Sequence, residues 1–146
     1  MKRGYHGTLE ITAIDRAGNR YVYATANTIT YDARKAMAHL LVGEDYVNRK
    51  VTKLALGTGA TAPVRGNTAL QIPLLVVPAD SIVWPADGQV EFTTTLDFLS
   101  PANGSILTEA GLISNDETKL FARQVYTATP KDENFRLEFR WRIVFT

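Results

Sequence analysis

The chain has 146 residues, of which 45% are apolar, 16 are Lys or Arg and 15 are Asp or Glu, so its formal net charge is +1. This length and composition are typical of one globular domain, residues 1–146, with a sizeable core. The near-neutral charge argues against a specific nucleic-acid binder or a polybasic membrane patch, and the absence of cysteine excludes disulfides, thiolate nucleophiles and cysteine metal sites.

The N-terminal residues predict an arm rather than a targeting segment. No apolar run follows Lys2 and Arg3, so we expect no signal peptide, and no stretch reaches the ~20 apolar residues of a membrane helix. Residues 7–14 and 20–26 are predicted strands joined by a turn with Gly18 and Asn19. This hairpin, residues 1–26, is either a pair of edge strands or an arm that grips a neighbouring subunit.

One helix is predicted, over residues 30–42. Thr30 is a suitable N-cap and Gly43 a suitable stop. Apolar residues recur at three- and four-residue spacing and predict one buried stripe. These residues are Ala33, Ala36, Met37, Leu40 and Leu41. His39 lies off the centre of the stripe, and we expect neither it nor His6 to bind a metal or to act in catalysis.

Residues 51–56 are a predicted strand that runs into a glycine-rich loop at 57–63. The Gly-Lys-Ser/Thr of a phosphate-binding loop does not follow, so we interpret it as a loop whose glycines permit unusual backbone angles. Two short apolar patches follow within residues 68–84, and such patches are either core or a subunit contact. We interpret this segment as a loop that contacts other subunits, through Leu74, Leu75, Val76, Val77, Ile82 and Trp84.

The longest two-residue alternation in the chain covers residues 134–146 and predicts one long antiparallel strand with an aromatic inner face. Residues 89–98 alternate in the same way and are the expected partner strand. The outer faces would carry opposite charges. We therefore expect Arg136, Arg140 and Arg142 to form either a solvated, partly paired face or a contact with another subunit or a nucleic acid. With strands at 106–113 and 120–126 and a loop at 129–133, the chain predicts a mainly β fold. This is an antiparallel sandwich or barrel of about seven or eight strands with one short helix.

Catalytic chemistry is sparse in this sequence. No nucleophile elbow or paired-histidine zinc motif is present. Asp80, Asp87 and Glu91 are spaced like nuclease carboxylates, but no lysine stands two residues beyond Glu91. The acidic residues are expected in turns or on the outward side of strands. We therefore predict no catalytic residue, no metal site and no cofactor, and a protein that is not an enzyme.

The order of several short motifs resembles small structural proteins of tailed bacteriophages, found among tail, neck and tail-fibre-base components. The resemblance covers about residues 27–145, although Ile113-Ser114 stands where relatives commonly carry an aromatic residue. The motifs are Asn27-x-Ile29-Thr30, Leu56-Gly-Thr-Gly-Ala-Thr-Ala-Pro63, Asn67-Thr-Ala-Leu70, Glu109-Ala-Gly-Leu112, Leu120-Phe-Ala-Arg123, Lys131, and Phe-x-Leu-x-x-x-Trp-x-Ile at 135–143.

This resemblance implies a virion protein that is made in the host cytoplasm and assembles through repeated symmetric contacts rather than through chemistry. Its partners would be other phage virion proteins and further copies of itself, in the tail, neck or collar. It also implies that residues 109–112 pack beneath the loop shaped by Gly57, Gly59 and Pro63. Two alternatives stay open: a capsid decoration or cement protein, and a host-surface or glycan-binding module.

Overall fold

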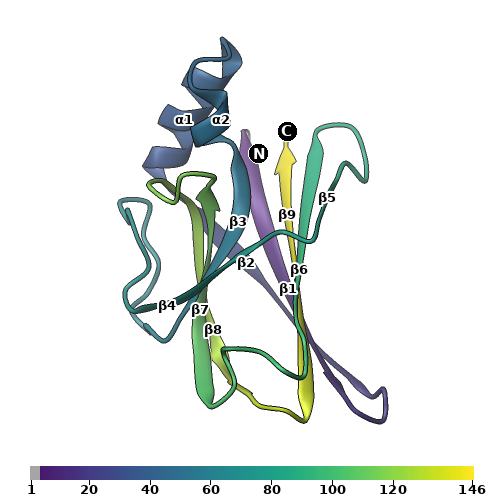
Figure 1. The fold of residues 1–146 in the computed structure, drawn as a ribbon. Coiled ribbons are helices and arrows are strands. Elements are labelled where there is room, and N and C mark those ends of the chain that lie inside the picture. The colour runs from purple at the N-terminus through teal and green to yellow at the C-terminus, as the bar shows by residue number, and fades with distance from the viewer. Residues whose placement is uncertain (1–3) are drawn as a thin grey trace.

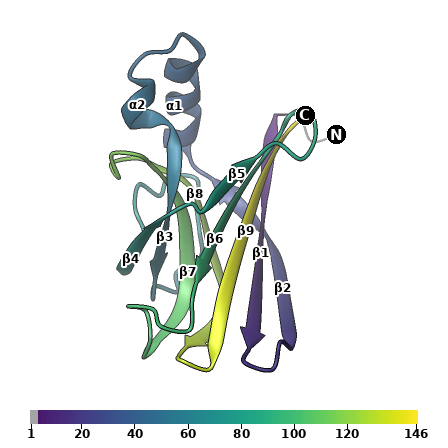
Figure 2. The same ribbon diagram turned by 45° about the vertical axis from the view of Figure 1, so that its right-hand side comes forward.

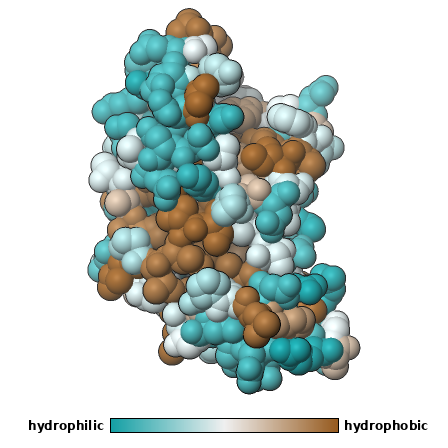
Figure 3. Space-filling model, in the orientation of Figure 1, coloured by the Kyte–Doolittle hydropathy of each residue, from teal (hydrophilic) through white to brown (hydrophobic). Residues whose placement is uncertain are grey.

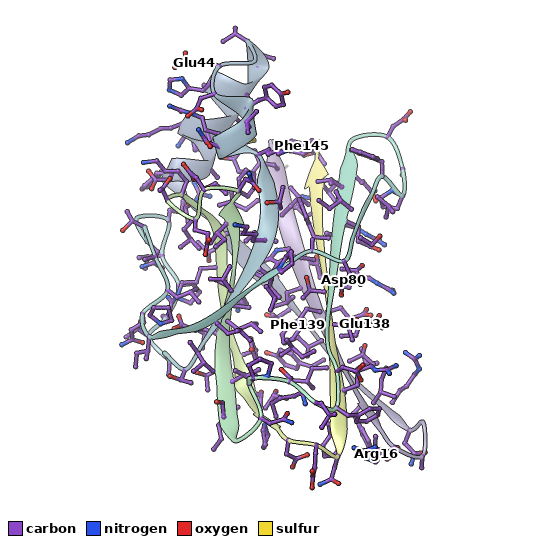
Figure 4. The ribbon with its side chains drawn as sticks, viewed as in Figure 1. Arg16, Glu44, Asp80, Glu138, Phe139 and Phe145 are labelled. Atoms are coloured by element: carbon purple, nitrogen blue, oxygen red, sulfur yellow. The ribbon has the colours of Figure 1, made fainter. Side chains whose placement is uncertain are left out.

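The C-terminal alternation forms β9 (Phe135–Phe145) in the computed structural model, which describes residues 4–146. Inner residues Leu137, Phe139 and Trp141 are fully buried. Figure 4 shows Phe139 and its neighbour Glu138 on opposite sides of the strand. β9 lies between β1 (Tyr5–Asp15) and β6 (Gln89–Leu96) and pairs with both antiparallel. The predicted pairing of residues 89–98 with the C-terminal strand is therefore confirmed.

Nine strands form a single antiparallel sheet that curls into a half-barrel (Figure 1). Their order across the sheet is β4-β3-β7-β8-β2-β1-β9-β6-β5. The mainly β prediction is confirmed. The strand number is higher than predicted because the segment interpreted as a loop, residues 68–84, supplies both edge strands. The remaining strands are β2 (Arg20–Ile29), β3 (Val51–Gly57), β4 (Pro73–Pro78), β5 (Ser81–Val83), β7 (Ser105–Ser114) and β8 (Leu120–Lys131).

The two edge strands are consecutive in the chain but lie at opposite edges of the sheet. Figures 1 and 2 show the chain crossing from β4 to β5 over the open side of the half-barrel. Ala79 donates its backbone N–H to Thr52 O (2.8 Å) beside β4, and Asp80 donates its own to Thr93 O (2.8 Å) beside β5. The Asp80 carboxylate also accepts Thr95 N–H at 2.7 Å. Two residues therefore tie one edge of the sheet to the other.

The predicted N-terminal hairpin is confirmed as β1 and β2, with the Asp15 carboxylate accepting backbone N–H groups of Ala17 and Asn19 in the turn. The interpretation of these strands as an edge pair is wrong, since they lie between β8 and β9. The backbone pairing of β2 with β8 is limited to Thr28 and Ile29. Residues 1–3 of the predicted arm lie outside the described residues, and its grip on a neighbour stays a prediction.

The predicted helix is confirmed as α1 (Tyr31–Leu41), capped by Thr30 Oγ1, which accepts Ala33 N–H at 3.1 Å. A second helix, α2 (Tyr46–Arg49), was not predicted. The expected stripe is wrong at its C-terminal end. Ala33 and Ala36 are buried, whereas Leu41 is 87% exposed, because the helix projects beyond the end of the sheet (Figure 1). Neither helix within residues 4–146 has the length and apolar character needed to cross a membrane.

The predicted loop at 129–133 is only partly a loop, because β8 continues to Lys131. The Lys131 side chain is fully buried, and its ammonium donates to Asn103 Oδ1 (2.6 Å) and Asp132 O (2.8 Å). Burial lowers the pKa of this ammonium. The backbone carbonyl of Lys131 accepts Gly104 N–H at 2.9 Å. Lys131 thus extends the strand by fastening the loop before β7 to its end.

Candidate functional site

A loop of residues 58–72 covers the outer face of β7 and is held there by one carboxylate. Glu109 Oε1 accepts the backbone N–H groups of Gly59 (3.0 Å) and Ile72 (2.8 Å), and Oε2 accepts that of Gln71 (3.0 Å). The Glu109 side chain is completely buried. It points away from the main core because a bulge between Leu107 and Glu109 changes the alternation of β7. We call residues 58–72 the clipped loop.

Arg123 of β8 completes this cluster. Its Nε and Nη2 both lie 2.9 Å from Glu109 Oε2, and the arginine side chain is 1% exposed. Its terminal nitrogens also donate to Asn67 Oδ1 (3.2 Å) and Thr61 Oγ1 (3.4 Å) in the clipped loop. The pair therefore binds the loop at its beginning, middle and end. This arrangement supplies the additional hydrogen bonds that a buried ion pair needs to be tolerated.

The glycines of the loop motif are required by this close packing. A Cβ atom on Gly59 would lie 2.6 Å from Glu109 Oε1, and one on Gly57 would collide with the Ile72 carbonyl oxygen. A side chain at either position would push the loop off the carboxylate. The expectation that residues 109–112 pack beneath this loop is confirmed by these contacts.

The protonation state of Glu109 is also consistent with its role in holding the clipped loop. Burial raises the pKa of this carboxyl, but the hydrogen bonds from Ile72, Gln71, Arg123 and Gly59 outweigh burial, so the pKa is lowered. The group is therefore ionised at neutral pH. The expectation that acidic residues occupy turns or solvated strand faces is wrong for Glu109, because the loop covers the face on which it stands. The sequence signal for this role of Glu109 was that its motif belongs to the same series of motifs as the glycine-rich loop.

The arginines of β9 lie on the outer face and are largely paired within the chain. Arg142 Nη2 lies 2.7 Å from Glu91 Oε2 on β6, and Arg140 Nε lies 3.5 Å from Glu91 Oε1. Arg136 pairs with Asp97 at 3.3 Å. The predicted opposite charges across β6 and β9 are confirmed. Arg140 and Arg142 keep 44% and 46% of their side chains exposed, and a subunit contact through them stays a prediction.

The six apolar residues predicted to contact other subunits divide into two groups. Leu75, Val77 and Ile82 pack against the core. Leu74, Val76 and Trp84 are exposed by 46%, 37% and 75%. β4 alternates between the two environments because successive strand residues face opposite sides. Figure 3 shows apolar residues gathered on the face that carries β4. Ile72, which directly precedes β4 in the chain, is also exposed.

Residues that could have formed a catalytic or metal site are used differently or lie apart. Asp80 and Glu91 make the contacts described above, and His39 Nδ1 lies 3.2 Å from Glu44 on the helical projection. Within residues 4–146, no group of three His, Cys, Asp or Glu side chains has a geometry suited to a metal ion. No family model, curated protein or solved structure matches this chain.

Proposed function

We propose that this protein is a non-enzymatic structural component of a tailed phage virion that assembles as a symmetric oligomer in the tail, neck or collar. The observation that carries the proposal is the exposed apolar edge at β4. Leu74 and Val76 point outward there, next to Ile72, and each is more than a third exposed. Apolar surface of this kind on a strand edge is a typical contact with another chain.

The backbone of β4 adds to this surface. β3 pairs with one side of β4, and within residues 4–146 no strand pairs with its other side. Natural edge strands are commonly protected by charged side chains or by proline. Residues 73–78 read Pro-Leu-Leu-Val-Val-Pro, so this edge has a proline at each end and no charge between them. A neighbouring copy that packed on this edge would bury its apolar side chains and cover its free backbone groups.

The clipped loop supports the same proposal from another direction. The motif residues that carry the phage resemblance, among them Gly59, Asn67, Glu109 and Arg123, converge in one buried cluster. Their carboxylate and guanidinium groups are engaged with the chain itself. Such a cluster stabilises a scaffold, and a virion component needs a rigid scaffold with repeated contacts.

The oligomer is tested by light scattering of the purified full chain. We expect a closed ring, and Leu74→Glu with Val76→Glu should dissociate it by placing charges in the interface. Leu99→Glu is the control, because Leu99 is 85% exposed in the loop after β6. It should leave the mass unchanged. A wild-type monomer at all concentrations would contradict the proposal and favour capsid decoration, where the lattice supplies the symmetry.

Substitutions test this edge better than a deletion of residues 74–84. That deletion removes β5 and most of β4, including Leu75 and Val77, which pack on the core.

The virion assignment needs a separate measurement. Mass spectrometry of purified phage particles from cells that carry the gene should detect peptides of this chain at a stoichiometry that matches the ring. Their absence from the particles would contradict a structural role.

A further inference from the structure

A polar cavity of about 560 Å³ lies at the end of the half-barrel next to α1. It is formed by the start of β1, the end of β2, the first turn of α1 and the clipped loop. Its volume is within the range of small-molecule sites. The side chains and termini that matter for its chemistry are His6, Asn27, Thr28, Arg34, Arg65 and Thr146.

The cavity carries positive charge. Arg34 and Arg65 line it, no Asp or Glu side chain is among its lining residues, and the one anionic lining group is the main-chain carboxylate of Thr146. The Arg34 guanidinium lies 5.9 Å from the centre of the Tyr31 ring. Within residues 4–146 neither guanidinium makes an ion pair, although Arg123 and Arg142 both do. These two arginines are therefore free to bind an anion from outside the chain.

The backbone around the cavity is well held. Tyr31 donates its N–H to Arg65 O at 2.8 Å, which joins the clipped loop to the start of α1. Thr30 Oγ1 caps the helix and also donates to Leu120 O at 2.5 Å. Both arginines therefore stand on fixed segments that are far apart in the sequence. The backbone that carries the two arginines is therefore fixed before a ligand binds.

Asn27 gives a second, independent sign of a missing partner. It lines the cavity, and its side-chain nitrogen and oxygen are both buried without a hydrogen-bond partner in the described residues. The amide packs directly over Gly7, where a Cβ atom would collide with it. Buried polar groups are nearly always hydrogen-bonded, and Asn27 is an exception at the wall of the cavity.

We propose that this cavity binds a phosphate-type oxyanion through Arg34 and Arg65. Guanidinium groups present paired N–H donors that match the oxygens of a phosphate. The cavity is larger than one phosphate ion, so the anion is either free phosphate or the phosphate group of a small organic molecule. The site lies at the helical end of the molecule and is separate from the contacts assigned to β4.

The test is a titration of the full chain with inorganic phosphate and, separately, with adenosine monophosphate, each against sodium chloride at equal ionic strength. Binding is followed by calorimetry and by amide shifts of residues 4–7, 27–34 and 65. We expect saturable phosphate binding tighter than chloride binding. Tighter binding of the nucleotide assigns the site to an organic phosphate, and equal binding assigns it to the free ion.

The decisive variant is Arg34→Gln with Arg65→Gln, which should weaken phosphate binding at least about tenfold. The hydrogen bond from Tyr31 N–H survives this change because it uses the Arg65 backbone carbonyl, and the helix cap is the Thr30 hydroxyl. Lys35→Gln is the matched control, since it removes one charge from the same helix outside this cavity, and it should bind within about twofold of wild type. Should the double variant unfold, each single variant is measured. Phosphate binding no tighter than chloride, or equal weakening in the control, overturns the proposal.

Discussion

The two halves of the curled sheet each contain a glutamate–arginine pair, and the pairs behave differently. Glu109 and Arg123 join β7 and β8, with side chains 0% and 1% exposed. Glu91 and Arg142 join β6 and β9, with side chains 11% and 46% exposed. The buried pair holds a fifteen-residue loop through backbone hydrogen bonds, whereas the outer pair links two neighbouring strands. The same kind of ion pair thus holds a loop against the sheet in one half and links two adjacent strands at the surface in the other.

The two pairs differ in behaviour because they differ in their contact with solvent. Removing one member of the buried pair leaves an unpaired charge in the interior. At the outer pair Arg142 is half exposed to water, and Glu91 keeps a second partner in Arg140, so the cost of removing Arg142 is small. The hydrogen bonds from the clipped loop to Glu109 make the buried pair part of a network. Its members should therefore lose stability together when one is removed.

The largest expected effect is that of Arg123→Met. It should reduce the free energy of unfolding by about 3–5 kcal/mol, because Glu109 would remain buried as an uncompensated anion. Urea denaturation at neutral pH measures this loss, and amide exchange in residues 58–72 should accelerate. Arg142→Met is the control at the outer pair and should cost about 1 kcal/mol or less. Equal losses in the two variants would show that burial does not separate the pairs.

A smaller effect is expected from Gly59→Ala. The new Cβ would lie 2.5 Å from Gln71 Cβ and 2.6 Å from Glu109 Oε1, and the resulting displacement of the loop should cost about 1–3 kcal/mol. Gly66→Ala in the same loop is the matched control, because no atom lies within 4 Å of its Cβ position. Thermal unfolding of both variants measures the difference. If Gly66→Ala were equally destabilising, steric contact with Glu109 and Gln71 would not explain the requirement for glycine at position 59.

The buried pair should also give the protein a dependence on acid. Burial raises the pKa of Glu109 but its hydrogen bonds outweigh this, so the folded pKa lies below the ordinary value of 4.5. Such a carboxyl stabilises the fold above its unfolded pKa, and this contribution is lost as the pH falls through the folded pKa. The stability advantage of wild type over Glu109→Gln should therefore be largest at neutral pH and shrink below about pH 4.5. Denaturant curves across this range measure it, and a constant difference would contradict it.

The smallest effect is expected at the outer pair. A double-mutant cycle with Glu91→Gln and Arg142→Gln should give a coupling energy of about 0.2–1 kcal/mol. The coupling should decrease in about 1 M salt, where charges are screened over roughly 3 Å. Urea denaturation of the four proteins at low and high salt provides the values. A coupling as large as that of the buried pair would remove the contrast between the halves.

Local pattern was sufficient to predict several elements of this protein. The alternation of residues 134–146 predicts β9, its aromatic inner face and its charged outer face, because side chains of a strand alternate at every residue. Thr30 and Gly43 mark the ends of α1 through capping and positive φ. The turn at residues 15–19 joins β1 to β2 in the same local way. Each of these features depends on neighbours in the sequence.

Only the tertiary structure decided which distant segments meet. The placement of β4 and β5 at opposite edges, the burial of Glu109 beneath the clipped loop and the exposure of Leu41 depend on contacts between segments far apart in the chain. A single sequence contains the side chains for such contacts, but its hydrophobic periodicity does not specify which distant segment each side chain will meet. A glutamate on an outer strand face is solvated or buried according to whether a loop covers it, and packing of the whole chain determines that outcome.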